Sequence, residues 1–67
     1  MSLRDEDVRI DIYRAGSQCA VRVLHIPTGL VAEEHSYASQ YQNRKLAMER
    51  LANLVVAYLL HEQRHND

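Results

Sequence analysis

The fold depends most on residues 20–33, Ala20-Val21-Arg22-Val23-Leu24-His25-Ile26-Pro27-Thr28-Gly29-Leu30-Val31-Ala32-Glu33. Two runs rich in β-branched residues flank a turn that contains Pro27 and Gly29. Proline fixes φ near the value that the first corner of a turn needs, and glycine permits a positive φ. The stretch is therefore predicted to form a β-hairpin, around which the rest of the chain is arranged.

A further strand is predicted before this hairpin, because the sequence alternates from Val8 onward with the period of a half-buried strand. One face would carry Val8, Ile10 and Ile12, and the other Arg9, Asp11 and Tyr13. A break follows at residues 14–18, which include Gly16 and Ser17. Strands are then predicted over about 19–26 and 30–34, and the short links between them favour an antiparallel meander.

One long helix is predicted after the third strand. Ser36 or Ser39 is a suitable N-cap, and residues 40–63 are rich in helix formers without Gly or Pro. An apolar stripe is expected to lie on the sheet: Ala47, Leu51, Leu54, Val55 and Tyr58. The predicted fold class is α+β, a three-stranded antiparallel β-meander packed against one long C-terminal α-helix (β-β-β-α). Residues 8–67 would form a single domain and residues 1–7 a disordered N-terminus.

The second half of this helix, residues 52–60, is apolar on nearly every side. A helix of this kind is normally buried all round, whereas a three-stranded sheet covers one side. In one interpretation, Val56, Leu59 and Leu60 fold over an edge of the core. In the other, a self-association surface meets a second copy or another protein, through Val56, Ala57, Leu59 and Leu60. The small size of the domain favours the second interpretation, because a short chain buries little apolar surface and a partner chain would add to its stability.

Composition excludes several classes of protein. The chain of 67 residues is too short for more than one domain, and its single cysteine, Cys19, excludes an intrachain disulfide. A net charge of −1 excludes a strong sequence-independent grip on nucleic acid, although it permits a local basic patch. No apolar run reaches membrane-spanning length, so a cytoplasmic domain without a cofactor and without membrane contact is expected.

Three segments together resemble the catalytic domain of class I peptide chain release factors. Residues 8–15 (VRIDIYRA) are similar to the strand that leads into the catalytic loop of that family, and Ala20-Val21-Arg22-Val23 with His25-Ile26-Pro27-Thr28-Gly29 resembles its central hairpin. Ser39-Gln40, Asn43, Lys45 and Ala47-Met48-Glu49-Arg50-Leu51 resemble its helix. The resemblance covers residue 8 to about residue 51 and implies an α+β fold.

A departure from the family pattern bears on activity. In that family, a long mobile loop with Gly-Gly-Gln stands between the first two strands and promotes hydrolysis of peptidyl-tRNA on the ribosome. Here four residues, Gly16-Ser17-Gln18-Cys19, separate Ala15 from Ala20. A turn of four residues projects almost nothing, whereas a loop of over ten reaches far at about 3.3 Å per residue. We therefore expect no hydrolase activity, and the protein is predicted not to be an enzyme.

Binding to the ribosome or to ribosomal RNA is the function that the resemblance then implies. The candidate contact residues are Arg14, Gln18, Gln40, Asn43, Arg44 and Lys45. Arg14, Arg44, Lys45 and Arg50 could form a basic patch, or a solvated face, since acidic residues are interspersed. Tyr37-Ala38 stands where the family tends to be charged, which weakens the transfer of RNA contacts. The alternative function is a homo-oligomeric protein-interaction module with no ribosomal role.

Other motifs favour structural roles. His61-Glu62-Gln63-Arg64-His65 fits the H-E-x-x-H pattern of zinc hydrolases, but a polar helix terminus explains it better, and no metal site is predicted. His25 and His35 flank the third strand and its turn as polar structural positions, and Cys19 is expected to be a small packing residue.

Overall fold

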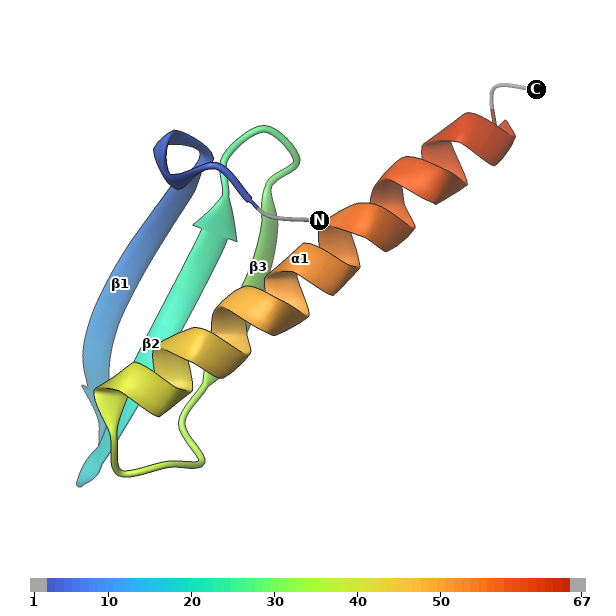
Figure 1. Cartoon of the computed structure of the whole chain (residues 1–67). Coiled ribbons are helices and arrows are strands. Elements are labelled where there is room, and N and C mark those ends of the chain that lie inside the picture. Colours follow the sequence, from blue (N-terminus) through green and yellow to red (C-terminus); the bar gives the residue numbers. More distant parts are fainter. Residues whose placement is uncertain (1–2, 66–67) are drawn as a thin grey trace.

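The computed structural model describes the backbone of residues 3–65 and the side chains of residues 3–63. Its elements are a 3₁₀ turn η1 (Asp5–Asp7), strands β1 (Val8–Ala15), β2 (Gln18–His25) and β3 (Leu30–Glu34), and helix α1 (Gln40–His65). The strands form one antiparallel sheet in the order β1-β2-β3, and α1 crosses one face of it (Figure 1). The predicted α+β meander with one long helix is confirmed.

The turn between β2 and β3 is held by the residues that the sequence singles out. Gly29 has a φ of +75°, and its N–H donates to the carbonyl of His25 over 2.7 Å. The hydroxyl of Thr28 accepts from the amide of Leu30 at 3.3 Å and lies 2.8 Å from Nδ1 of His25. Since His25 is buried and bonded inside the turn, its predicted structural role agrees with its place.

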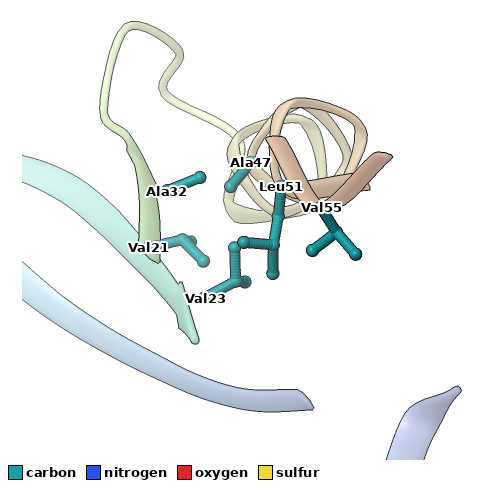
Figure 2. Packing of buried hydrophobic residues seen from close by; sticks show 6 residues of the cluster. All are labelled: Val21, Val23, Ala32, Ala47, Leu51 and Val55. Carbon is teal, nitrogen blue, oxygen red and sulfur yellow. The ribbon is translucent and has the colours of Figure 1, made fainter. Parts of the chain in front are cut away.

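The hydrophobic core lies between α1 and the two strands that it covers, β2 and β3. Figure 2 shows the helix residues directed at the sheet and the strand residues directed back at them. The cluster consists of Val21, Val23, Ala32, Ala47, Leu51 and Val55, all less than 5% exposed. Burying a valine or leucine side chain contributes about 1.5–3 kcal/mol, so the three valines and Leu51 contribute more than the two alanines.

The predicted apolar stripe of α1 is correct at three positions and wrong at two. Ala47, Leu51 and Val55 are buried, whereas Leu54 and Tyr58 remain 40% and 39% exposed. The stripe continues instead toward the start of the helix, where Asn43 is fully buried. The buried positions recur every four residues and stop at Val55, because the sheet does not extend beneath the later turns.

The apolar face of β1 is also more exposed than its alternation predicts. Ile10 and Ile12 lie opposite Val23 and Val21 of β2 and share their face of the sheet. Nevertheless Ile10 is 41% and Ile12 61% exposed, since α1 packs over β2 and β3 rather than over β1. The helix thus leaves one strand of the meander uncovered.

Helix α1 is longer than the sheet beneath it. Its 26 residues span roughly 39 Å, against about 27 Å for an eight-residue strand. The molecule is accordingly elongated, 47 × 21 × 18 Å, and the later turns of α1 stand clear of the sheet (Figure 1). Among the described residues, no helix combines the length and apolar character that a membrane crossing requires.

The chain before β1 contains a short turn, whereas residues 1 and 2 of the N-terminus predicted to be disordered lie outside the described residues. Residues 5–7, predicted to be disordered, form the 3₁₀ turn, and the carbonyl of Asp7 accepts from the amide of Ile26 over 2.8 Å. Leu3 packs against the edge of the core beside Val8. This segment therefore closes the end of the core near the β2–β3 turn.

Candidate nucleic-acid interface

The β1–β2 turn and the start of α1 lie side by side at one end of the molecule (Figure 1). We call this region the hairpin end and define it as residues 14–19 and 35–45. The turn itself has two residues, Gly16 and Ser17, between the paired Ala15 and Gln18. Gly16 has a φ of +66°, as the first position of a type II′ turn requires. The turn is therefore a compact corner without a projecting loop.

Asn43 ties the three parts of the hairpin end together. Its side-chain N–H groups donate to the carbonyls of Cys19 at 3.2 Å and Tyr37 at 2.8 Å, and its oxygen accepts from the amide of Tyr37 at 3.0 Å. The side chain is 0% exposed. Asn43, a predicted RNA contact, is therefore directed inward, and it positions the residues around it instead of presenting a polar group to a partner.

Ser39 caps the start of α1. Its hydroxyl accepts from the amide of Gln42 at 3.3 Å, and its carbonyl accepts from the amide of Asn43 at 3.1 Å. The first turn of α1 contains no acidic residue, although acidic residues are favoured there. The positive end of the helix dipole thus has no neighbouring carboxylate in its own first turn.

The basic residues of the hairpin end form a region of one sign of charge. Arg14, Arg44 and Lys45 are all exposed. Arg44 lines a small groove with Ile12 and Gln40, and Arg14 follows Ile12 by two residues on the same face of β1. Residues 12–21 and 35–48 contain these three basic residues and no Asp or Glu. The local charge is therefore positive although the chain as a whole is slightly negative, and the next acidic residue along α1, Glu49, lines one groove with Lys45.

Two exposed tyrosines, which are not among the predicted RNA contacts, lie beside this region. Tyr37 is 45% and Tyr41 64% exposed, and both line an open groove with Lys45. Exposed aromatic rings beside basic side chains are the usual surface on which unpaired bases stack. Tyr37 precedes the helix, so no helical spacing in the sequence indicates that it shares a surface with Tyr41.

The remaining predicted contacts are less prominent. Gln18 is exposed beside the turn, and Gln40 is partly buried, with an Oε1 atom that lacks a hydrogen-bond partner within residues 3–63. Arg50 does not join the basic region. It donates to Oε2 of Glu34 at 2.8 Å and to the carbonyl of Glu33 at 2.7 Å, and so ties α1 to β3.

Glu34 is a nearly buried carboxylate that organises the segment after β3. Its Oε1 accepts from the hydroxyl of Ser36 at 2.7 Å and from the amides of His35 and Ser36 at 3.0 and 3.1 Å. The bonds from Ser36, then that from His35, and the contact with Arg50 lower the pKa of Glu34 from 4.5 to about 2. Such bonds favour the charged form of the carboxyl.

This lowered pKa predicts acid-dependent stability. Because the folded pKa lies below the unfolded value, the stabilisation from Glu34 is present above about pH 4.5 and is lost as the pH falls toward 2. In thermal unfolding, Glu34→Gln is expected to melt below the wild type at pH 7, with the gap closing between pH 4.5 and 2. Glu49→Gln, on an exposed part of α1, is the matched control. A gap that stays constant with pH would contradict this role for Glu34.

The face of the sheet away from α1 carries a ladder of opposite charges, as the alternation of β1 predicts. Arg22 lies opposite Asp11 and donates to Glu33 at 3.1 Å, and Tyr13 donates to the other oxygen of Glu33 at 2.7 Å. These bonds, Tyr13 first, lower the pKa of Glu33, and the bond to Glu33 raises the pKa of Tyr13. Acidic and basic groups are paired here, so this face does not attract an anion.

The other candidate groups have no catalytic arrangement in the described part of the chain. Cys19 is a free, half-buried thiol. Residues 3–63 contain no cluster of three side chains suited to hold a metal ion. Of the H-E-x-x-H pair, His61 lies on α1, and the side chain of His65 lies outside the described residues.

The predicted oligomer surface lies on the part of α1 that stands clear of the sheet. Ala57 is exposed and Val56 is half-buried. Leu59 and Leu60 are 43% and 57% exposed, so the interpretation in which they fold over the core is wrong. Whether a partner covers them stays a prediction.

Comparison with known proteins identifies the relatives of this chain. It matches no protein-family model. It is 35% identical over 71 residues to peptide chain release factor 2 of Aliarcobacter butzleri, which covers 92% of this chain and 20% of that protein. It is 42% identical over 60 residues to release factor 2 of Kosmotoga olearia and 43% identical over 60 residues to release factor 1 of Clostridium beijerinckii. Each of these covers 76% of this chain, and 16% and 17% of the relative.

The matched stretches are longer than the parts of this chain that they cover. For the Aliarcobacter protein, 92% of 67 residues is about 62, so about nine of the 71 positions have no counterpart here. For the Kosmotoga and Clostridium proteins, 76% is about 51 residues, which leaves about nine of 60. This chain, which spans about a fifth or less of the length of these relatives, is a release-factor-like domain, homologous over most of its own length to peptide chain release factors.

Proposed function

We propose that this release-factor-like domain acts in translation by binding ribosomal RNA through its hairpin end, without hydrolysing peptidyl-tRNA. The observation that carries the proposal is the local charge. Arg14, Arg44 and Lys45 are exposed near the start of α1, and residues 12–21 and 35–48 contain no Asp or Glu, so that Glu49 is the first carboxylate beyond them on the helix. Phosphate groups bind at such positions, because backbone N–H groups and cationic side chains both favour them. A role on the ribosome would place the protein in the cytoplasm.

Tyr37 and Tyr41 support RNA as the anion. A base that is not paired can stack on an exposed aromatic ring while its phosphate contacts a neighbouring cation. Lys45 lines the same groove as both tyrosines, so both kinds of contact are available on one surface. Asn43 keeps this surface in place from beneath, through its bonds to both sides of the hairpin end.

The absence of hydrolysis is proposed on the length of the β1–β2 turn. We place the nine or so additional residues of the relatives in this turn, where the family resemblance puts a catalytic loop. A loop of nine residues, out and back, projects roughly 15 Å at 3.3 Å per residue. A corner of two residues, Gly16 and Ser17, has no such reach. In peptide-release assays on stalled ribosomes, we expect no release above background, and release dependent on Gln18 would refute this part.

Removal of the two helical cations tests the binding part separately. Arg44→Ala/Lys45→Ala is expected to weaken ribosome binding about tenfold. It should also reduce the dependence of binding on salt concentration, because a protein that makes fewer phosphate contacts releases fewer counterions when it binds. Arg4→Ala/Arg64→Ala makes the same change in net charge at positions outside the hairpin end. Co-sedimentation over a series of salt concentrations measures both. Equal losses in the two variants would show that net charge, and not this site, controls binding.

A protein-interaction module is the second candidate function. Its support is the apolar surface of α1 beyond the sheet, with Leu59 and Leu60 exposed. A module of this kind would bind its partner equally well after the Arg44→Ala/Lys45→Ala substitution. The same double variant therefore distinguishes the two candidates.

A further inference from the structure

We propose that two copies of this chain pair through the free edges of β1, in one defined register, to form a continuous antiparallel sheet. The proposal concerns a surface remote from the exposed leucines of α1 and does not depend on RNA binding. In the order β1-β2-β3, strand β1 lies at an edge of the sheet. Natural proteins protect such edges with proline, bulges, inward charges or a covering element.

The edge of β1 has few of these protections within the described residues. All eight residues of β1 pair with β2 in unbroken register, so it contains no bulge, and its sequence contains no proline or lysine. Helix α1 covers β2 and β3 instead. An edge of eight residues without a bulge therefore remains accessible to another strand.

The hydrogen-bonding groups on this edge belong to the even-numbered residues. The carbonyl of Asp7 accepts from the amide of Ile26, which continues the β1–β2 ladder and sets its phase. Cross-strand bonding alternates in an antiparallel pair, so residues 9, 11, 13 and 15 bond toward β2. The N–H and C=O groups of Val8, Ile10 and Ile12 consequently point away from the sheet, toward the free edge.

One register of two antiparallel copies gives apolar pairs on one face of the strand and pairs of opposite charge on the other. With Ile10 opposite Ile10 of the second copy, Val8 pairs with Ile12, and each of these pairs can exchange two backbone hydrogen bonds. In the same register Arg9 faces Asp11 of the second copy, twice by symmetry. Opposite charges and apolar pairs in such positions each stabilise a sheet. The arrangement is self-complementary, as a two-fold interface requires.

The neighbouring registers lack this match. Shifting the pairing by one step places Asp11 opposite Asp11, a like-charge contact at the close, non-bonded position. A further step places Ile10 opposite Arg14 and leaves Arg9 without an acidic partner in the second copy, so that it keeps its contact with Asp11 of its own strand, at 3.3 Å, and gains none. The charge pattern of β1 thus selects a second copy of the same strand in one alignment. In that alignment Ile10, 41% exposed, and Ile12, 61% exposed, gain apolar neighbours.

A pair of charge variants tests the register. Arg9→Asp gives a copy with two acids at positions 9 and 11, and Asp11→Arg gives one with two bases. Each is expected to be monomeric alone, whereas an equimolar mixture forms the heterodimer, as measured by native mass spectrometry and sedimentation at high micromolar concentration. Circular dichroism checks that each variant is folded, since position 11 lies opposite Arg22 in its own sheet. A mixture of folded variants that stays monomeric overturns the proposal.

A matched set of lysine variants tests the surface. Ile10→Lys is expected to weaken self-association about tenfold or more, because two lysines would face each other across the axis. Ile26→Lys makes the same change at an isoleucine 58% exposed in the β2–β3 turn, and should leave the dimer intact. Leu60→Lys tests the rival surface on α1. The proposal fails if the wild type is monomeric, or if Leu60→Lys dissociates the dimer while Ile10→Lys does not.

Discussion

Substitution of Leu51 by alanine is expected to remove about 3 kcal/mol of folding free energy, within the 2–5 kcal/mol found for buried leucines. Leu51 is fully buried and stands between the other members of the core (Figure 2). A domain of this length has roughly 3–10 kcal/mol of total stability. The variant should therefore lose between about a third and all of its stability, and it should unfold at a much lower urea concentration than the wild type.

Urea unfolding followed by circular dichroism measures this loss. Leu60→Ala is the matched control, because Leu60 lies on the same helix and is 57% exposed. Its stability should change by less than about 0.5 kcal/mol, since the side chain has little burial to lose. Similar losses in both variants would mean that the later turns of α1 are packed as tightly as the core.

Substitution of Asn43 by alanine is expected to cost about as much, roughly 3 kcal/mol, for a different reason. The truncation leaves the carbonyls of Cys19 and Tyr37 and the amide of Tyr37 without their partner. A buried polar group left unpaired costs about 1–3 kcal/mol, and some of these groups will regain water. Ribosome binding should weaken as well, because Tyr37 loses its support.

Asn53→Ala, at an exposed position of the same helix, separates this effect from any change in helix propensity. Asn43→Asp offers a sharper test. It keeps the size of the side chain but replaces the donating amide by a carboxylate that would face two carbonyl oxygens. Chemical denaturation should rank the variants Asn53→Ala, Asn43→Ala and Asn43→Asp in order of increasing damage. A neutral Asn43→Ala would show that the three bonds contribute little.

The local structure could be predicted because each element depends on neighbouring residues. Pro27 and Gly29 specify a turn in any context, and the alternation of residues 8–13 specifies a strand. The absence of Gly and Pro after residue 39 specifies a helix. The bounds of β3 agree with the prediction, and Ser39 rather than Ser36 proves to be the cap.

The placement of the helix over the sheet could not be predicted in the same way. The alternation of β1 shows which residues share a face, but it does not show which strands the helix covers. Ile10 and Ile12 are on the helix side of the sheet, yet α1 packs mainly on β2 and β3. The positive charge of the hairpin end could not be recognised from the sequence alone. Arg50 and the acidic residue beside it are grouped with the basic residues of this end along the chain, whereas in the folded chain Arg50 pairs with Glu34. Asn43 carried a usable signal, since it precedes Ala47, Leu51 and Val55 at intervals of four.

Because α1 is longer than the sheet, its two halves are expected to differ in their stability against local unfolding. As far as Val55, opening the helix exposes the core, so backbone amides there should exchange with solvent only through global unfolding. Residues 56–63 of the helix include no buried side chain, and isolated helical segments of this length are marginal in water. They can melt and re-form while the sheet stays intact, and deuterium uptake should therefore rise along the helix after residue 55.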